Sequence, residues 1–230
     1  MSEKEDQDTV CHFLASRNLS AKEINGARQA IEKDLLALVG EDRENHFEVT
    51  VALMQSMWKS YDRHFFKNNL IDTLEKTRHR IIFMINNRLR TSAGRCFAGV
   101  LNPQTKLFEY KMELAPKVFR DTFKNEEKSV VNNGVVCRNR LQCAMLIFEH
   151  ELLHALMFMF APESTRLGHS ELFVRMARSL FQHTDIHHNL LGNTGGDPRK
   201  TVNCTNGKPA SSTGKKRPSK KAQQEPLTIL

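Results

Sequence analysis

The stretch Phe148-Glu149-His150-Glu151-Leu152-Leu153-His154-Ala155 lies in the middle of the longest apolar run of the chain. Residues four apart project from one face of a helix, so His150 and His154 can bind the same metal ion. Glu151 directly follows the first histidine. This H-E-x-x-H arrangement is typical of sites in which two histidines bind zinc and the glutamate acts as general base toward a zinc-bound water. The alternative is a core helix that carries two polar interruptions.

The apolar run extends from residue 144 to residue 161 and predicts a helix buried within the protein. It is interrupted by four ionisable side chains, those of Glu149, His150, Glu151 and His154. So many ionisable groups argue against a membrane-spanning helix, and no membrane partner is expected. Residues 1–6 are polar and show no secretory signal, and the five cysteines contain no C-x-x-C pair. Both features favour an intracellular protein with reduced thiols.

The positive charge of the chain is concentrated at its C-terminal end. Residues 197–230 contain eight lysines and arginines against two acidic residues, which is a charge of +6 out of the formal +8. The composition of residues 192–230 predicts a disordered basic tail. Its candidate nucleic-acid-binding residues are Lys215, Lys216, Arg217, Lys220 and Lys221, which also fit a nuclear-import signal. The alternative for this segment is a generic solubilising tail.

Hydrophobic periodicity predicts an α+β fold with helices packed on a small, about three-stranded, antiparallel sheet. Helices are expected at residues 20–40, 47–65, 115–123 and 138–160, and after Ser170. Strands are expected at residues 81–85, 96–101 and 108–114, with the last two paired as a hairpin. Ser20 and Glu23 form a capping box at the start of the first helix. Residues 124–134 are expected to form a polar surface loop.

A catalytic zinc site needs a third protein ligand besides the two histidines. The candidates that follow His154 are Glu163, His169, Glu171, His183, His187 and His188. His169 is favoured because it follows Gly168 in a loop just before a helix, from which its imidazole can return over the first two ligands. Glu171 is the rival, and the last three histidines are expected to be solvated. Glu149 is interpreted as lying behind the ligands or facing solvent.

Four segments of the chain resemble the SprT-like metalloproteases, specifically the Spartan branch. They are His150-Glu151-Leu152-Leu153-His154-Ala155, Gly168-His169-Ser170-Glu171-Leu172-Phe173, Arg88-Leu89-Arg90-Thr91-Ser92-Ala93-Gly94-Arg95-Cys96 and Glu113-Leu114-Ala115-Pro116-Lys117-Val118-Phe119. The resemblance spans about residues 47–190, with the segments in the family's order. It departs from the family pattern at Ser170-Glu171-Leu172, and at Ile85, where the family often has a tryptophan.

The resemblance implies a zincin-like metalloprotease domain at residues 45–191, after an N-terminal helical extension at 1–44 and before the tail at 192–230. It implies one catalytic Zn²⁺ held by His150, His154 and His169, with Glu151 as the general base. It also implies a nuclear, chromatin-associated protease that cleaves proteins bound or crosslinked to DNA and is switched on by DNA. A cytoplasmic pool is the alternative location.

Two other functions remain open at the level of the sequence. One is a zinc peptidase that acts on ordinary protein substrates and has no role at DNA. The other is a non-catalytic, DNA-associated scaffold in which zinc is structural. Glu151 argues against the scaffold, because a structural zinc site has no need of a general base.

Overall fold

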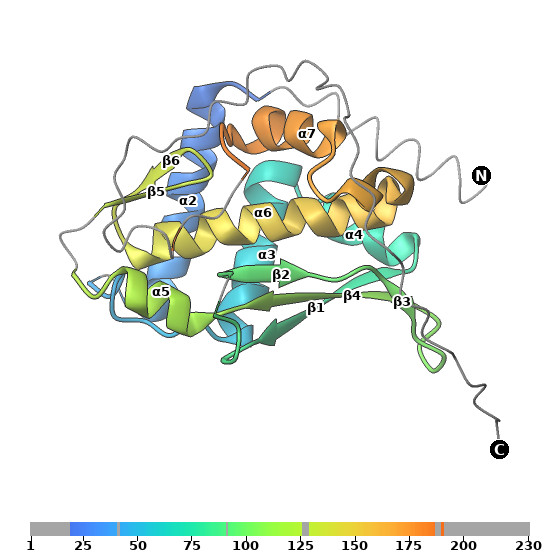
Figure 1. The fold of residues 1–230 in the computed structure, drawn as a ribbon, viewed down its shortest axis with the longest axis horizontal. Coiled ribbons are helices and arrows are strands. Elements are labelled where there is room, and N and C mark those ends of the chain that lie inside the picture. The colour runs from blue at the N-terminus through green and yellow to red at the C-terminus, as the bar shows by residue number, and fades with distance from the viewer. Residues whose placement is uncertain (1–18, 41, 91, 126–128, 187–189, 191–230) are drawn as a thin grey trace, which may run out of the picture. The chain divides into compact units, whose positions relative to one another are not determined.

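A computed structural model describes residues 19–40, 42–90, 92–125, 129–186 and 190 (Figure 1). These residues build one hydrophobic core, which extends from Ile24 near the start of the described chain to Leu190 at its end. The fold is mixed α and β, with helices and small sheets. The proposed basic tail at 192–230 lies outside the described residues.

The long helix α6 (Arg140–Phe160) runs through the centre of the fold and carries the H-E-x-x-H motif (Figure 1). It begins at Asn139, whose side chain accepts a hydrogen bond from the N–H of Gln142, and it ends just before Pro162. The helix is long and apolar enough to cross a membrane, but 89% of its most apolar 18-residue stretch is buried within the protein. The predicted helix at 138–160 is confirmed, and its apolar surface is covered by the rest of the chain.

The main sheet lies along one side of α6. It contains β1 (His79–Ile85), β2 (Gly94–Cys96), β3 (Val100–Leu101) and β4 (Phe108–Leu114). Both β2 and β3 pair antiparallel with β4, which confirms the predicted hairpin. However, β1 pairs parallel with β4, so the prediction of an antiparallel sheet is wrong and the sheet is mixed. The chain reverses direction twice between these strands, and β4 therefore inserts beside β1 pointing the same way.

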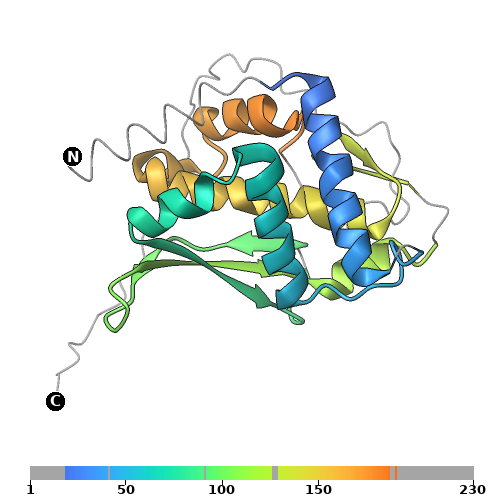
Figure 2. The same cartoon turned by 180° about the vertical axis from the view of Figure 1, so that it is seen from behind.

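Three helices lie behind α6 and the sheet in the view of Figure 1, and they face the viewer in Figure 2. They are α2 (Ala21–Val39), α3 (Val51–Phe66) and α4 (Leu70–Lys76), and the sequence had predicted the first two. The capping box at Ser20 and Glu23 is present as expected. Ile24, Ile31 and Leu35 of α2 are completely buried in the common core. The N-terminal helix is therefore packed into the same core as α6.

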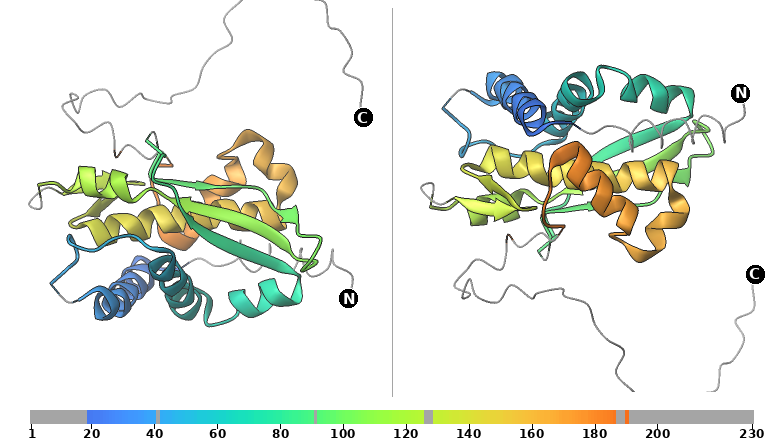
Figure 3. Two further views of the ribbon diagram at one scale, coloured as in Figure 1. Left: turned by 90° about the horizontal axis from the view of Figure 1, so that it is seen from below. Right: turned by 90° about the horizontal axis from the view of Figure 1, so that it is seen from above.

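The inner face of the main sheet packs on the helices through aromatic side chains. Phe83 of β1 contacts Phe148 of α6 at a ring distance of 5.9 Å, and Phe148 stacks on Tyr61 of α3 at 5.4 Å. Seen from below, the sheet lies in front of α6, and no described helix covers its other face (Figure 3). The sheet therefore packs on α6 with one of its two faces, while α2 and α3 pack on a different side of α6.

A second, two-stranded sheet replaces part of the predicted surface loop at 124–134. It is formed by β5 (Val130–Asn132) and β6 (Val135–Cys137), joined by Asn133 and Gly134 at φ values of 52° and 77°. Two successive positive φ values are typical of the tight turn that favours Asn-Gly in a two-residue hairpin. The loop prediction is therefore wrong at its C-terminal end, where a hairpin packs against α6.

The remaining described elements lie at the two ends of α6, with α5 beside its N-terminal end and the other two following its C-terminal end (Figure 1). They are α5 (Pro116–Thr122), the 3₁₀ helix η1 (Pro162–Leu167) and α7 (Glu171–Phe181). The helices α5 and α7 were both predicted. In Figure 1, α7 lies on the side of α6 opposite the main sheet. The helix with the H-E-x-x-H motif is thus held between α7 and β2.

Candidate metal centre

Three histidine side chains converge at the surface of α6. His150 and His154 lie one turn apart on this helix, and their Nε2 atoms are 3.1 Å apart. The Nε2 atom of His169, which precedes α7, lies 3.0 Å from that of His150 and 3.2 Å from that of His154. The three side chains therefore form a group that is compact enough to hold one metal ion.

The loop before α7 brings His169 back over α6. Gly168 has a φ of 66°, a left-handed value that favours glycine, and it turns the chain at the end of η1. Ser170 then caps α7, as predicted, because its hydroxyl accepts a hydrogen bond from the N–H of Phe173 at 3.3 Å. His169 is thus fixed between a glycine turn and a helix cap. Glu171, the rival ligand, is exposed and does not belong to the histidine group.

The spacing of the three nitrogens fits a small metal ion. A tetrahedral zinc ion with Zn–N bonds of about 2.0–2.1 Å separates its nitrogen ligands by about 3.3–3.4 Å. The observed separations of 3.0–3.2 Å are close to this value. Hydrogen bonds alone do not account for three Nε2 atoms so close together. A proton shared by two of these nitrogens leaves the lone pair of the third pointing at the same space. A cation that accepts all three lone pairs resolves the contact.

The three histidines differ in their exposure to solvent. His150 is only 2% exposed, whereas His154 and His169 are half-buried. The centre therefore has a closed side toward the core and an open side toward solvent. An open side is what distinguishes catalytic zinc sites from structural ones, which are closed by four protein ligands.

Glu151 points from α6 toward β2. A Cβ atom added to Gly94 would lie 2.8 Å from both Cγ and Oε1 of Glu151, closer than side chains tolerate. The carboxylate thus lies directly against the backbone of β2, and only glycine leaves room for it. Burial and the negative charge of Glu151 raise the pKa of the Cys96 thiol, two residues farther along this strand. In the sequence Gly94 stands out only through the resemblance of its segment to the Spartan branch, and the structure gives a steric reason for it.

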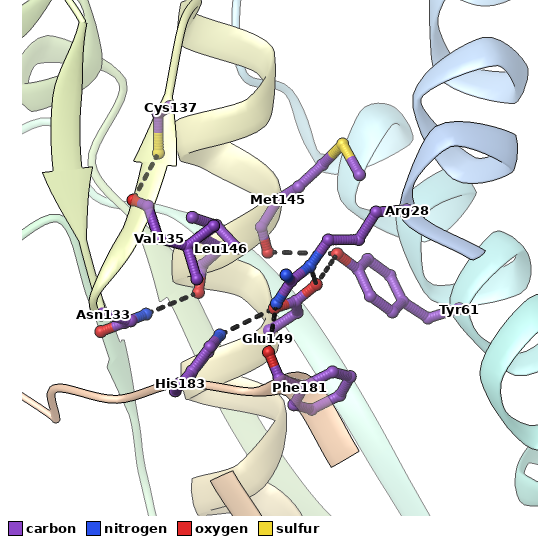
Figure 4. Close-up of polar contacts among 10 residues, drawn as sticks. All are labelled: Arg28, Tyr61, Asn133, Val135, Cys137, Met145, Leu146, Glu149, Phe181 and His183. Atoms are coloured by element: carbon purple, nitrogen blue, oxygen red, sulfur yellow. Dashed lines mark hydrogen bonds and ion pairs between the residues drawn. The ribbon is translucent and has the colours of Figure 1, made fainter. Parts of the chain in front are cut away.

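Glu149 precedes Glu151 by two residues, so it lies on nearly the opposite side of α6, and it is completely buried. Its polar contacts are drawn in Figure 4. Arg28 of α2 donates to both of its oxygens, at 2.8 Å from Nε and 2.6 Å from Nη2. The Tyr61 hydroxyl of α3 donates to it at 2.8 Å, and Nε2 of His183 contacts it at 2.8 Å. The solvent-facing interpretation of Glu149 and the solvated interpretation of His183 are both wrong. Both side chains are buried, and they contact each other.

The charges of this buried network keep Glu149 ionised and Tyr61 protonated. Burial alone would raise the pKa of Glu149, but the charge and hydrogen bonds of Arg28, helped by His183, lower it to about 2. Burial and the charge of Glu149 raise the pKa of Tyr61 well above its usual value, so the phenol stays a hydrogen-bond donor. Arg28 also donates to the carbonyl oxygen of Phe181 at 2.6 Å. The network therefore joins α2, α3 and the end of α7 to the back of α6.

The other candidates of the sequence lie apart from the centre. Glu163 is exposed on η1. His187 and His188 lie outside the described residues, and so do the basic tail residues Lys215, Lys216, Arg217, Lys220 and Lys221.

The buried ion pair predicts a large stability difference between two arginine variants. Arg28→Met leaves the Glu149 carboxylate buried without its counter-ion, and should lower the free energy of unfolding by about 3–5 kcal/mol. Arg120→Met is the control, because Arg120 and Glu48 form an ion pair whose side chains are 44% and 57% exposed. That exposed pair should contribute about 0–1 kcal/mol. Urea unfolding of the metal-free proteins measures both, and equal losses would contradict the role given to Arg28.

The ligand set predicts which side chains retain metal. His169→Ala should lose most of the bound zinc, because two histidines on one helix leave the ion short of a ligand. Glu171→Ala should keep one zinc per chain. Competition against a chromophoric chelator, with metal content measured by mass spectrometry, checks both variants. The reverse outcome would make Glu171 the third ligand.

No family model, curated protein or solved structure matches this chain. The arrangement of the three imidazoles and of Glu151 is therefore the basis on which a function can be assigned.

Proposed function

We propose that the protein is a zinc-dependent endopeptidase in which His150, His154 and His169 hold a single Zn²⁺ and Glu151 is the general base. The observation that carries this proposal is the convergence of three Nε2 atoms within 3.0–3.2 Å of one another, beside a buried glutamate one residue after the first ligand. The zincin-like classification of the fold is part of the same proposal.

The chemistry follows from the donor set. A bound zinc ion lowers the pKa of a water molecule to about 7 and polarises a carbonyl oxygen. Glu151 accepts the proton of the attacking water, and the water oxygen forms a bond to the peptide carbonyl carbon. Glu151 then delivers the proton to the amine nitrogen as the C–N bond breaks. The carboxylate occupies the space that a side chain at position 94 would otherwise fill.

Two features favour catalytic over structural zinc. Structural sites are almost always closed by four protein ligands, whereas the group found in the described part of the chain contains three histidines. Two of these are partly exposed, so a substrate carbonyl has a route to the site. A scaffold with structural zinc would also have no use for a buried carboxylate at Glu151.

We extend the proposal to proteins bound or crosslinked to DNA as substrates, and to the nucleus as the site of action. The support for this step is the resemblance of the sequence to Spartan-type SprT-like proteases, together with the basic C-terminal segment. Lys215, Lys216, Arg217, Lys220 and Lys221 are the proposed phosphate contacts. Such contacts release counterions, so the affinity for DNA falls steeply with salt.

Two variants beside the metal test the general base. Glu151→Gln should retain zinc and lose about 10²–10⁴-fold in peptidase turnover, because proton transfer is removed. Gly94→Ala should also lower turnover with zinc retained, since the new methyl group displaces the carboxylate. Gly26→Ala is the control, because a Cβ at Gly26 meets no atom within 4 Å. Full activity of Glu151→Gln would refute the assignment of the general base.

The role of DNA is tested separately, by measuring cleavage of a protein crosslinked to DNA and of the same protein free, each with and without added single-stranded DNA. A variant with all five basic tail residues changed to Gln should bind DNA more weakly. Its dependence of log affinity on log salt should be less steep, by about 0.7 for each phosphate that the variant no longer neutralises. Equal cleavage of both substrates without added DNA would instead support a general peptidase.

A further inference from the structure

One aromatic ring contacts all three proposed metal ligands. The centroid of the Phe173 ring lies 5.1 Å from that of His150, 4.6 Å from that of His154 and 4.7 Å from that of His169. The interplanar angles are 63°, 32° and 45°, so each imidazole meets the phenyl ring in a different orientation. The side chain of Phe173 is completely buried. The phenyl ring therefore forms the inner wall of the centre.

The position of this ring is coupled to that of the third ligand by a helix cap. Ser170 is the N-cap of α7, and its hydroxyl accepts the hydrogen bond from the backbone N–H of Phe173. His169 is the residue directly before the cap. One local motif therefore sets the backbone on both sides of Ser170, with a ligand before it and the aromatic wall three residues after it.

The physical effect of such a wall is on ring orientation. An imidazole binds a metal well only when its nitrogen lone pair points at the ion, and ligating histidines are normally held in place by their surroundings. Packing of an aromatic ring against the imidazoles restricts their rotation, so less rotamer freedom is lost when the ion binds. It also keeps water away from the core side of the ligands.

We propose that Phe173 is a positioning residue of the metal centre: its ring holds the three imidazoles in the orientation in which their Nε2 atoms converge. This inference rests on the proposed metal site and adds a determinant of metal affinity that is itself no ligand. The residue offers no ligand atom of its own, and it acts only through His150, His154 and His169.

The test is to compare Phe173→Leu with Phe181→Leu. Both phenylalanines lie on α7 and are completely buried, but Phe181 packs on Tyr61 and Phe65, away from the metal ligands. The two variants should lose similar stability in urea unfolding of the zinc-free proteins. Phe173→Leu should in addition bind zinc about 10–100-fold more weakly, which is the usual effect of changing residues that orient metal ligands.

The absorption spectrum of the Co²⁺-loaded protein provides a readout independent of activity, because it reports ligand geometry. Phe173→Leu should change this spectrum, whereas Phe181→Leu should leave it as in the wild type. Wild-type zinc affinity and spectrum in Phe173→Leu would overturn the proposal. If Phe173→Leu does not fold, Phe173→Met takes its place and is read by the same criteria. Failure of the wild type to bind zinc or cobalt would instead refute the metal site itself.

Discussion

The buried carboxylate of Glu149 is the constraint on which the rest of the structure depends. A charge at the centre of a fold is costly unless a counter-ion and hydrogen bonds compensate for the loss of hydration. Here the compensation comes from Arg28, Tyr61 and His183, which belong to three different parts of the chain. Satisfying one side chain of α6 therefore determines where α2, α3 and the end of α7 must lie. The N-terminal helix is as much a part of this arrangement as the helices after residue 45.

Glu149 and Glu151 show how one helix gives two carboxylates opposite tasks. At 3.6 residues per turn, positions two apart point to nearly opposite sides of a helix. Glu149 faces the helices and is fully paired, whereas Glu151 faces β2 and lies against the only kind of residue, glycine, that leaves it room. One side of α6 is thereby tied to the other helices, and the side of Glu151 lies against β2.

The features that the sequence predicted well are local ones. The caps at Ser20 and Ser170, the long helix and the pairing of β2 and β3 with β4 depend on neighbouring residues or short spacings. The parallel pairing of β1 with β4 could not be predicted in the same way, because strand order depends on contacts between distant segments. The hairpin at Asn133 and Gly134 could have been predicted, since Asn-Gly within Val-Val-Asn-Asn-Gly-Val-Val is a strong turn signal between two β-branched runs.

The sequence also contains an indication of the buried Glu149 network, and it is found in α2 rather than in α6. Arg28 follows Ile24 by four residues and precedes Ile31 by three, so it lies on the buried apolar face of that helix. A charge in such a place indicates a buried partner of opposite charge, although the sequence alone cannot identify it.

The same reasoning explains why the sequence predicts the third proposed metal ligand less directly than the first two. His150 and His154 are related by helix geometry alone. The position of His169 depends instead on how α7 packs on α6, because the local turn at Gly168 and the cap at Ser170 do not by themselves bring the imidazole to the other two. Metal binding and the docking of α7 should therefore stabilise each other, since an ion that binds only the folded arrangement favours it.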